Sequence, residues 1–79
     1  MTYTDKQIDN RINAIKSRYK NFVELKLEKV VDGDLFLIGE DSEGEEFYLR
    51  FKSNGRLFSH REGNWGIVDN FFYNEETDQ

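Results

Sequence analysis

The chain has neither cysteine nor proline among its 79 residues. Without cysteine it can form no disulfide, no thiolate metal site and no cysteine nucleophile. A cysteine-free chain fits a reducing compartment, so we expect a cytoplasmic protein. A chain of this length makes one domain that buries only about 60–65% of the surface its unfolded form exposes, and its stability should therefore be modest.

Long apolar segments are also missing. The first residues after Met1 are polar, TYTDKQIDNR, and lack the apolar core of a secretory signal peptide. No apolar run approaches the roughly 20 residues that a membrane-spanning helix needs. We therefore expect neither a leader nor a membrane partner.

The net charge of −5 is distributed unevenly along the chain. Residues 1–30 and residues 47–68 each carry +3, whereas residues 31–46 carry −7 and residues 69–79 carry −4. The acidic total is unfavourable for non-specific coating of nucleic acid, which requires many cations. Charge separation of this kind fits a specific protein surface as well as it fits solubility.

The N-terminal segment predicts an α-helix over about residues 5–20. Thr4 and Gln7 have the spacing of a capping box. Apolar residues then recur at spacings of four, three and four: Ile8, Ile12, Ile15 and Tyr19. This single narrow stripe can cover one face of a sheet.

After the helix the apolar period changes to two, which is typical of β-strands. Glycine-containing turns divide this part of the chain, and Asp32-Gly33 and Asn54-Gly55 are the clearest of them. All four residues of the segment LFLI are apolar, so both faces of a strand there would be apolar, which predicts a central strand covered on both faces. The expected strands span about 22–31, 35–40, 46–52, 56–61 and 65–73, and a polar tail follows over 74–79.

Short turns make successive strands antiparallel neighbours. The sequence therefore predicts an α+β fold, in which an N-terminal helix packs on a small antiparallel meander sheet of about five strands. It leaves open whether the sheet curls into a partly open barrel.

The Asn54-Gly55 turn decides which side chains share a face of the sheet. A two-residue turn there pairs Phe51 with Phe58 and Leu49 with His60 on the core face. The opposite face then carries Tyr48, Arg50, Lys52, Leu57, Ser59 and Arg61. A shift of one residue would exchange all of these assignments.

A single helix covers only one face, so we predict that the opposite, basic and aromatic face is the binding surface. Its predicted binding residues are Tyr48, Arg50, Lys52 and Arg61, together with Trp65. Trp65 also has a simpler interpretation as a packing residue near a turn, although tryptophan is enriched at binding hot spots.

No arrangement typical of an enzyme is visible. His60 is the single histidine, and Ser59 beside it would point to the opposite face, so the two cannot form a nucleophile–base pair within one strand. We interpret His60 as a structural residue near the sheet edge, with a general base or a ligand as the alternative. We expect no catalytic residue and no cofactor.

The acidic stretch over residues 32–46 could suggest a calcium site, but it does not match the EF-hand pattern. We expect a solvated acidic end of the sheet and no metal. Whether this end also binds a basic partner stays open.

In general character the chain resembles the accessory proteins that bacteriophages and mobile elements encode, many of which bind and block one host protein. The resemblance lies in a short, acidic chain without cysteine or proline that combines a helix with a small sheet; no motif carries it and no residue role follows from it. We predict a non-enzymatic protein-binding module that acts as an inhibitor or modulator of a host protein.

Two alternatives remain. Aromatic residues interleaved with basic ones on a sheet are typical of surfaces that stack single-stranded nucleic acid, although the RNP1 and GXXG signatures are missing. A homo-oligomer joined through an exposed edge strand is the other alternative.

Overall fold

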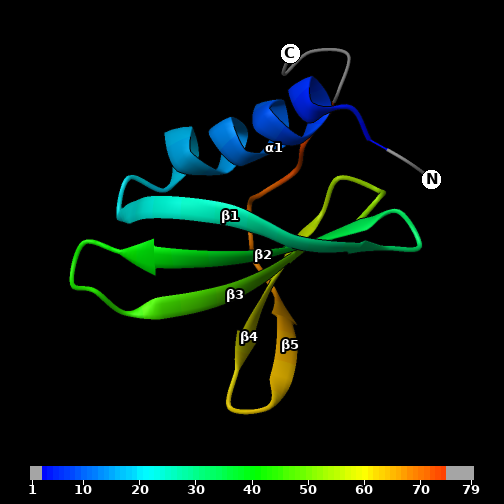
Figure 1. Cartoon of the computed structure of the whole chain (residues 1–79). Helices are drawn as coiled ribbons and strands as arrows, with labels where there is room; N and C mark the ends of the chain where they lie inside the picture. Colours follow the sequence, from blue (N-terminus) through cyan, green and yellow to red (C-terminus); the bar gives the residue numbers. More distant parts are fainter. Residues whose placement is uncertain (1–2, 75–79) are drawn as a thin grey trace.

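One helix packs on one face of a five-stranded antiparallel sheet in the computed structural model, which describes residues 3–74 except for the side chain of Arg61 (Figure 1). The elements are α1 (Asp5–Arg18), β1 (Phe22–Val31), β2 (Asp34–Asp41), β3 (Glu46–Phe51), β4 (Leu57–Arg61) and β5 (Asn64–Ile67). The strands lie in chain order across the sheet. This confirms the predicted α+β meander. The sheet is not closed into a barrel, and β1 and β5 form its two edges.

The helix begins and ends close to where the sequence predicts. The Gln7 amide donates to Thr4 Oγ1 (3.1 Å), and the Thr4 amide donates to Gln7 Oε1 (2.9 Å), which completes the capping box. The apolar stripe faces the sheet, and Ile15 on it is fully buried. One charged residue is buried beside the stripe: the Arg11 guanidinium lies over the rings of Tyr3 and Tyr73, at 4.7 and 5.0 Å from their centroids.

The β3–β4 hairpin has a register one residue away from the predicted one. Phe51 pairs with Leu57, where the sequence predicted Phe58. The loop contains three residues rather than two, because the Gly55 amide donates to the Lys52 carbonyl (3.0 Å) and the Lys52 amide donates to the Arg56 carbonyl (2.8 Å). Gly55 itself has a φ of +92°, so a type I turn is followed by a glycine bulge.

This shift exchanges the faces of β4. Leu57 and Ser59 pair with core-facing residues of β3 and lie on the helix side, contrary to the prediction. Phe58 and His60 lie on the opposite face, also contrary to the prediction. The predicted position of Leu57 is clearly wrong, since Leu57 is fully buried in the core.

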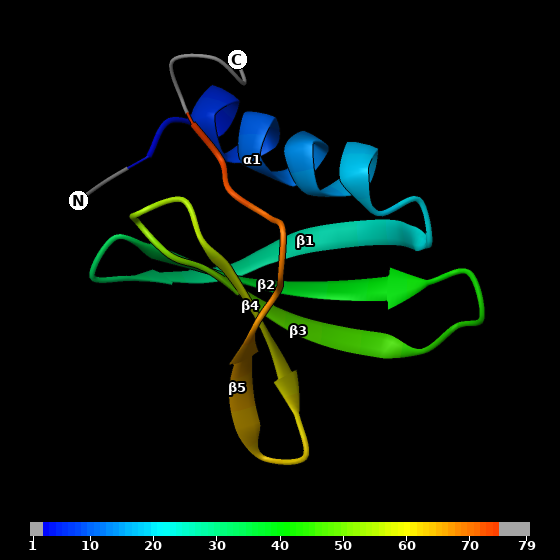
Figure 2. The ribbon, with the colours of Figure 1, turned by 180° about the vertical axis from the view of Figure 1, so that it is seen from behind.

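The predicted last strand over 65–73 is wrong beyond Ile67, where β5 ends. Asn70 adopts a φ of 64°, and the chain leaves the sheet edge and runs up to the helix (Figure 2). Phe71 and Tyr73 are 0% and 4% exposed, whereas Phe72 between them is 47% exposed. Burial therefore alternates over residues 71–73 as it would in a strand, but here it comes from packing between sheet and helix.

Hydrogen bonds fix this C-terminal segment without a partner strand. The Tyr73 amide donates to the Gly55 carbonyl (2.9 Å), and Arg18 Nη1 donates to the Phe72 carbonyl (2.9 Å). The Arg18 guanidinium also lies 4.8 Å from the centroid of the Phe71 ring. Basic residues of α1 thus hold the end of the chain over the core.

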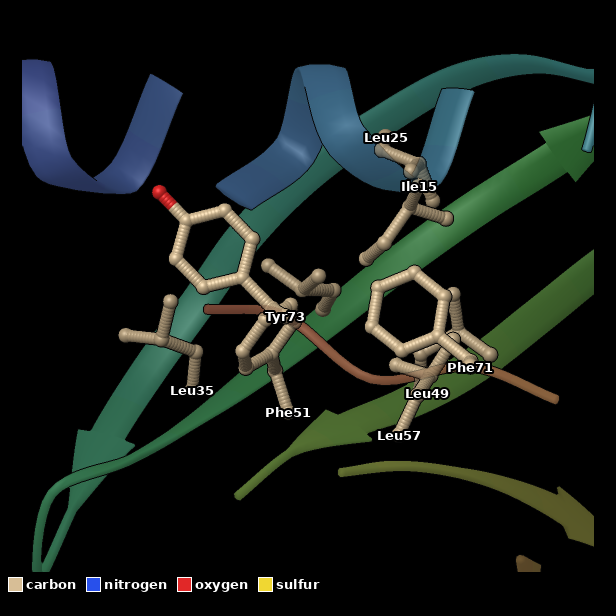
Figure 3. Close-up of a cluster of buried hydrophobic side chains, with 9 residues drawn as sticks. Ile15, Leu25, Leu35, Leu49, Phe51, Leu57, Phe71 and Tyr73 are labelled. Atoms are coloured by element: carbon tan, nitrogen blue, oxygen red, sulfur yellow. The ribbon is translucent and has the colours of Figure 1, made fainter. Parts of the chain in front are cut away.

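The core lies between the sheet, the helix and the C-terminal segment. Figure 3 shows how side chains from all three meet; the buried residues are Ile15, Leu25, Leu35, Leu37, Leu49, Phe51, Leu57, Phe71 and Tyr73. The other two apolar side chains of β2, Phe36 and Ile38, point away from this core and are only half-buried. The prediction that β2 is covered on both faces is therefore wrong.

None of the helices in residues 3–74 combines the length and the apolar character that a membrane crossing requires.

Candidate binding face

The face of the sheet away from α1, called here the helix-free face, carries aromatic side chains from four strands. The register places Phe36 of β2 beside Arg50 of β3, Arg50 beside Phe58 of β4, and Phe58 beside Ile67 of β5. His60 of β4 pairs with Trp65 of β5 on the same face. The one-residue shift of β4 is responsible, since it moves Phe58 and His60 to this side.

The rings on this face contact each other in a continuous series. Ring centroids lie 6.4 Å apart between Tyr48 and His60, 5.0 Å between His60 and Trp65, and 6.0 Å between Trp65 and Phe36. All three contacts are edge-to-face, the geometry that ring quadrupoles favour. We call these four residues the ring cluster.

The ring cluster stays accessible to solvent. Tyr48 is 43% exposed and Trp65 is 38% exposed, and the neighbouring Ile67 is 54% exposed. The rings are therefore held in place by each other but not covered. A contiguous apolar surface of this kind, anchored by tryptophan and tyrosine, is typical of binding sites.

Two of the predicted binding residues, Tyr48 and Trp65, belong to this cluster. The Tyr48 hydroxyl donates to Glu46 Oε1 (2.6 Å), and this bond raises the pKa of Tyr48 above its ordinary value of 10.0. The phenol therefore stays protonated, and with its proton donated to Glu46 its oxygen can accept a hydrogen bond from a partner. The side chain of Arg61, a third predicted residue, lies outside the described part of the chain.

The other two predicted residues, Arg50 and Lys52, surround a carboxylate that sequence reasoning missed. Asp34 is only 5% exposed. Its Oδ2 accepts from Arg50 Nε (3.0 Å) and Nη2 (2.8 Å), and its Oδ1 accepts from the Ser53 amide (3.0 Å). Lys52 Nζ lies 3.7 Å from Oδ2. Arg50 thus has a structural role beside its place on the helix-free face.

The environment of Asp34 has opposing effects on its pKa. Burial alone raises the pKa, because it disfavours the charged form. The hydrogen bonds from Arg50 and Ser53 and the charges of Lys52 and Arg50 outweigh burial, so the pKa of Asp34 lies below its ordinary 3.8. The carboxylate is ionised at neutral pH and ties the β1–β2 turn to the β3–β4 turn.

Three further residues of this face were missed by sequence reasoning: Phe36, Phe58 and Lys29. Lys29 Nζ and Arg50 Cζ each lie 5.1 Å from the centroid of the Phe36 ring, within the range of a cation–π contact. The sequence signal available for Phe36 was the unbroken apolar segment LFLI, because such a segment makes both faces of a strand apolar. Phe58 depended on the register and had no local signal.

The positive charge of the helix-free face is largely matched by nearby acids. Lys26 Nζ lies 3.2 Å from Glu24 Oε1, and Arg50 is bound to Asp34. Across residues 3–74, no group of three or more His, Asp or Glu side chains is placed to hold a metal ion. The face is therefore mainly aromatic, with cations at its margin.

Comparison of the chain with protein-family models, with curated proteins and with solved structures gave no significant match.

Proposed function

We propose that this chain is a non-enzymatic protein-binding module whose helix-free face contacts a partner protein. The observation that carries the proposal is the ring cluster, which remains about 40% exposed at Tyr48 and Trp65, while Leu49 and Phe51 on the opposite face of β3 are buried. Tyrosine and tryptophan supply much of the energy at protein interfaces, because they bury a large area at a small cost in side-chain entropy.

The chemistry of the face indicates the partner's surface. Lys29 and Arg50 flank the Phe36 ring, and Lys52 lies beside Asp34 at the adjoining turn. We infer a partner with an apolar patch bordered by carboxylates. Binding and blocking such a patch is how the module would act as an inhibitor or modulator of a host protein. A cytoplasmic location and a phage or mobile-element origin stay predictions from the sequence.

Capture from nuclease-treated lysate of the source or host cell tests this proposal. The tagged chain is compared with the double variant Tyr48→Ala, Lys29→Glu. We expect the variant to recover at least about tenfold less of the same protein, the loss typical of removing a hot-spot ring and reversing a charge at its margin. Arg50 is unsuitable for this test, because replacing it would leave the buried Asp34 without its main partner.

Lys20→Glu is the matched control. It makes the same charge change at an exposed residue between α1 and β1, away from the helix-free face. It should recover as much partner as the unmodified chain. Equal recovery by all three proteins would remove the helix-free face from consideration.

Single-stranded nucleic-acid binding by the same face is the second candidate. The series of accessible rings favours it, since every base can stack on an aromatic side chain. The ion pairs of Lys26 and Arg50 count against it, because they leave few cations for phosphates. Fluorescence anisotropy with labelled single strands at low salt would decide: an affinity that falls steeply with salt supports this candidate, and no binding ends it.

Association of two copies through an edge strand is also proposed as a mode of assembly. β1 is a ten-residue edge strand with exposed apolar side chains at Val23, Leu27, Val30 and Val31. Its bulges, between Phe22 and Glu24 and between Leu27 and Lys29, oppose regular pairing. Size-exclusion chromatography with light scattering settles the matter, since a strict monomer excludes it.

A further inference from the structure

A pocket of about 540 Å³ opens on the helix side of the β4–β5 hairpin. Residues of β4 and β5, the start of β1 and Val68 line it. This volume falls within the range of about 300–1,000 Å³ that small-molecule sites occupy. The pocket is thus large enough for a bicyclic molecule.

The pocket exists because of the register of β4. Ser59 pairs with Gly66 on the helix side, which places two of the smallest residues where a core would need large ones. A Cβ built on Gly66 would meet no atom within 4 Å. Had the predicted register held, Phe58 and His60 would occupy this side. The small side chains at positions 59 and 66 therefore leave this space, and no neighbouring side chain fills it beside Gly66.

Its walls are aromatic and aliphatic. Tyr19 and Phe22 pack edge-to-face at 6.1 Å, and Phe22 and Phe47 do so at 5.2 Å. Leu57 and Val68 add aliphatic surface. Flat apolar walls of this kind favour a flat apolar ligand, which can stack on one ring and meet the edge of another.

The described polar side chains of the pocket include no carboxylate, ammonium or guanidinium group. Ser59 and Asn64 lie on its hairpin side and supply a hydroxyl and a carboxamide, and Asn21 lies at the other end. None of the described residues that line the pocket is Asp, Glu, Lys or Arg, although 34% of the chain is charged. A charged ligand would lose its hydration here without gaining an opposite charge from the described residues of the pocket.

We propose that this pocket binds a small neutral molecule with a flat apolar body and one hydrogen-bonding group. The ligand lies against Tyr19, Phe22 and Phe47, and its polar group reaches Ser59 or Asn64. The proposal is independent of the protein-binding function, because these walls lie on the opposite side of the sheet from the ring cluster. His60, Trp65 and Ile67 line the pocket and also belong to the helix-free face, so the two surfaces share these residues.

The test is a titration of the ¹⁵N-labelled chain with 2-naphthalenemethanol, followed by amide chemical shifts. We expect saturable shifts at Leu57, Ser59, Gly66 and Val68, with a dissociation constant in the millimolar range or below. The charged analogues 2-naphthoate and 2-naphthylmethylammonium should bind at least about tenfold more weakly. Shifts of equal size with all three probes, or no saturable shift, would overturn the proposal.

Gly66→Val locates the binding. The added side chain points into the pocket, and no positive φ or close contact opposes it, so the variant should fold and lose the saturable shifts. Ser17→Val adds the same group on the exposed side of α1 and should keep them. Ser59→Leu fills the pocket from the neighbouring strand and replaces Gly66→Val if that variant fails to give a dispersed spectrum.

Binding that persists in a folded pocket-filling variant would place the probe elsewhere and contradict the proposal. Loss of the shifts in Gly66→Val, with unchanged capture of a partner protein, would show that the two sites work separately.

Discussion

The two faces of one sheet are completed in different ways. On the helix side, the core residues Leu49 and Phe51 of β3 are 1% and 2% exposed, whereas Tyr48 of the same strand is 43% exposed on the other face. The helix side is covered by α1 and by the C-terminal segment. On the helix-free face, the described side chains pack on one another, without a second layer among residues 3–74. Packing within one layer orders the rings but leaves them available to a partner.

The comparison also separates residues that look alike in the sequence. Arg11 and Arg18 hold the C-terminal segment over the core, and Arg50 holds a buried carboxylate. Lys29, by contrast, lies against the Phe36 ring. Charge at the margin of the helix-free face therefore comes mainly from lysines, which can move toward a partner at little cost to the fold.

The largest expected effect follows from removing a ring on the covered side. Phe71→Ala deletes a side chain with no exposed surface and should cost about 3–5 kcal/mol, because it loses buried area and leaves a cavity between sheet and helix. Small domains have only about 5–15 kcal/mol in total, so this variant should be marginally folded. Urea unfolding followed by the fluorescence of Trp65 measures the change.

Ile67→Ala is the control on the helix-free face, where Ile67 is 54% exposed. It should cost less than about 1 kcal/mol. Similar losses of unfolding free energy in Phe71→Ala and Ile67→Ala would mean that the covered and the exposed face contribute equally to stability, contrary to their exposure.

Two glycines provide the second contrast. Gly55 has a φ of +92°, and a Cβ there would lie 2.4 Å from the Tyr73 carbonyl oxygen. Gly55→Ala should therefore destabilise the fold by about 1–3 kcal/mol, because the turn and the C-terminal segment must separate. Gly66→Ala meets no atom and should change stability by less than about 0.5 kcal/mol. Thermal unfolding of the pair checks the prediction, and a reversed order would contradict the placement of the C-terminal segment.

A smaller effect, and one with a defined pH dependence, is expected at Asp34. Its pKa is lowered in the folded chain, so its ionised form contributes stability at neutral pH that is lost as pH falls through the folded pKa. Asp34→Asn should cost about 1–2 kcal/mol at pH 7, since the bonds from Arg50 and Ser53 weaken.

The difference in unfolding free energy between the unmodified chain and Asp34→Asn should be constant above about pH 5 and should shrink below about pH 4. Urea titrations at pH 7, 5, 4 and 3 measure it. If the stability advantage of the unmodified chain over Asp34→Asn grew toward low pH, burial of the ionised Asp34 would destabilise the fold more than its partners stabilise it.

Sequence reasoning succeeded where structure is set by neighbouring residues. The capping box at Thr4, the stripe through Ile15 and the strand over 22–31 depend on local spacing, and each is observed. What the period cannot show is whether an extended segment pairs with a strand or packs on a core without one.

The parts that failed depend on distant contacts or on one residue of loop length. Asn54-Gly55 fits a two-residue and a three-residue turn, and only the bond from Lys52 to Arg56 selects the second. That choice moved Phe58 and His60 to the helix-free face and opened the pocket at Ser59. The Asp34–Arg50 pair joins residues 16 positions apart, for which the sequence had no signal.

One measurement tests most directly whether the helix-free face binds a partner. The chain has a single tryptophan, so the indole Nε1–H of Trp65 gives one resonance that can be followed while the captured protein is added. We predict that this resonance and the amides of Tyr48 and Phe58 shift or broaden, while the amides of α1 over Asp5–Arg18 stay unchanged. An unchanged Trp65 indole together with shifts along α1 would contradict the account.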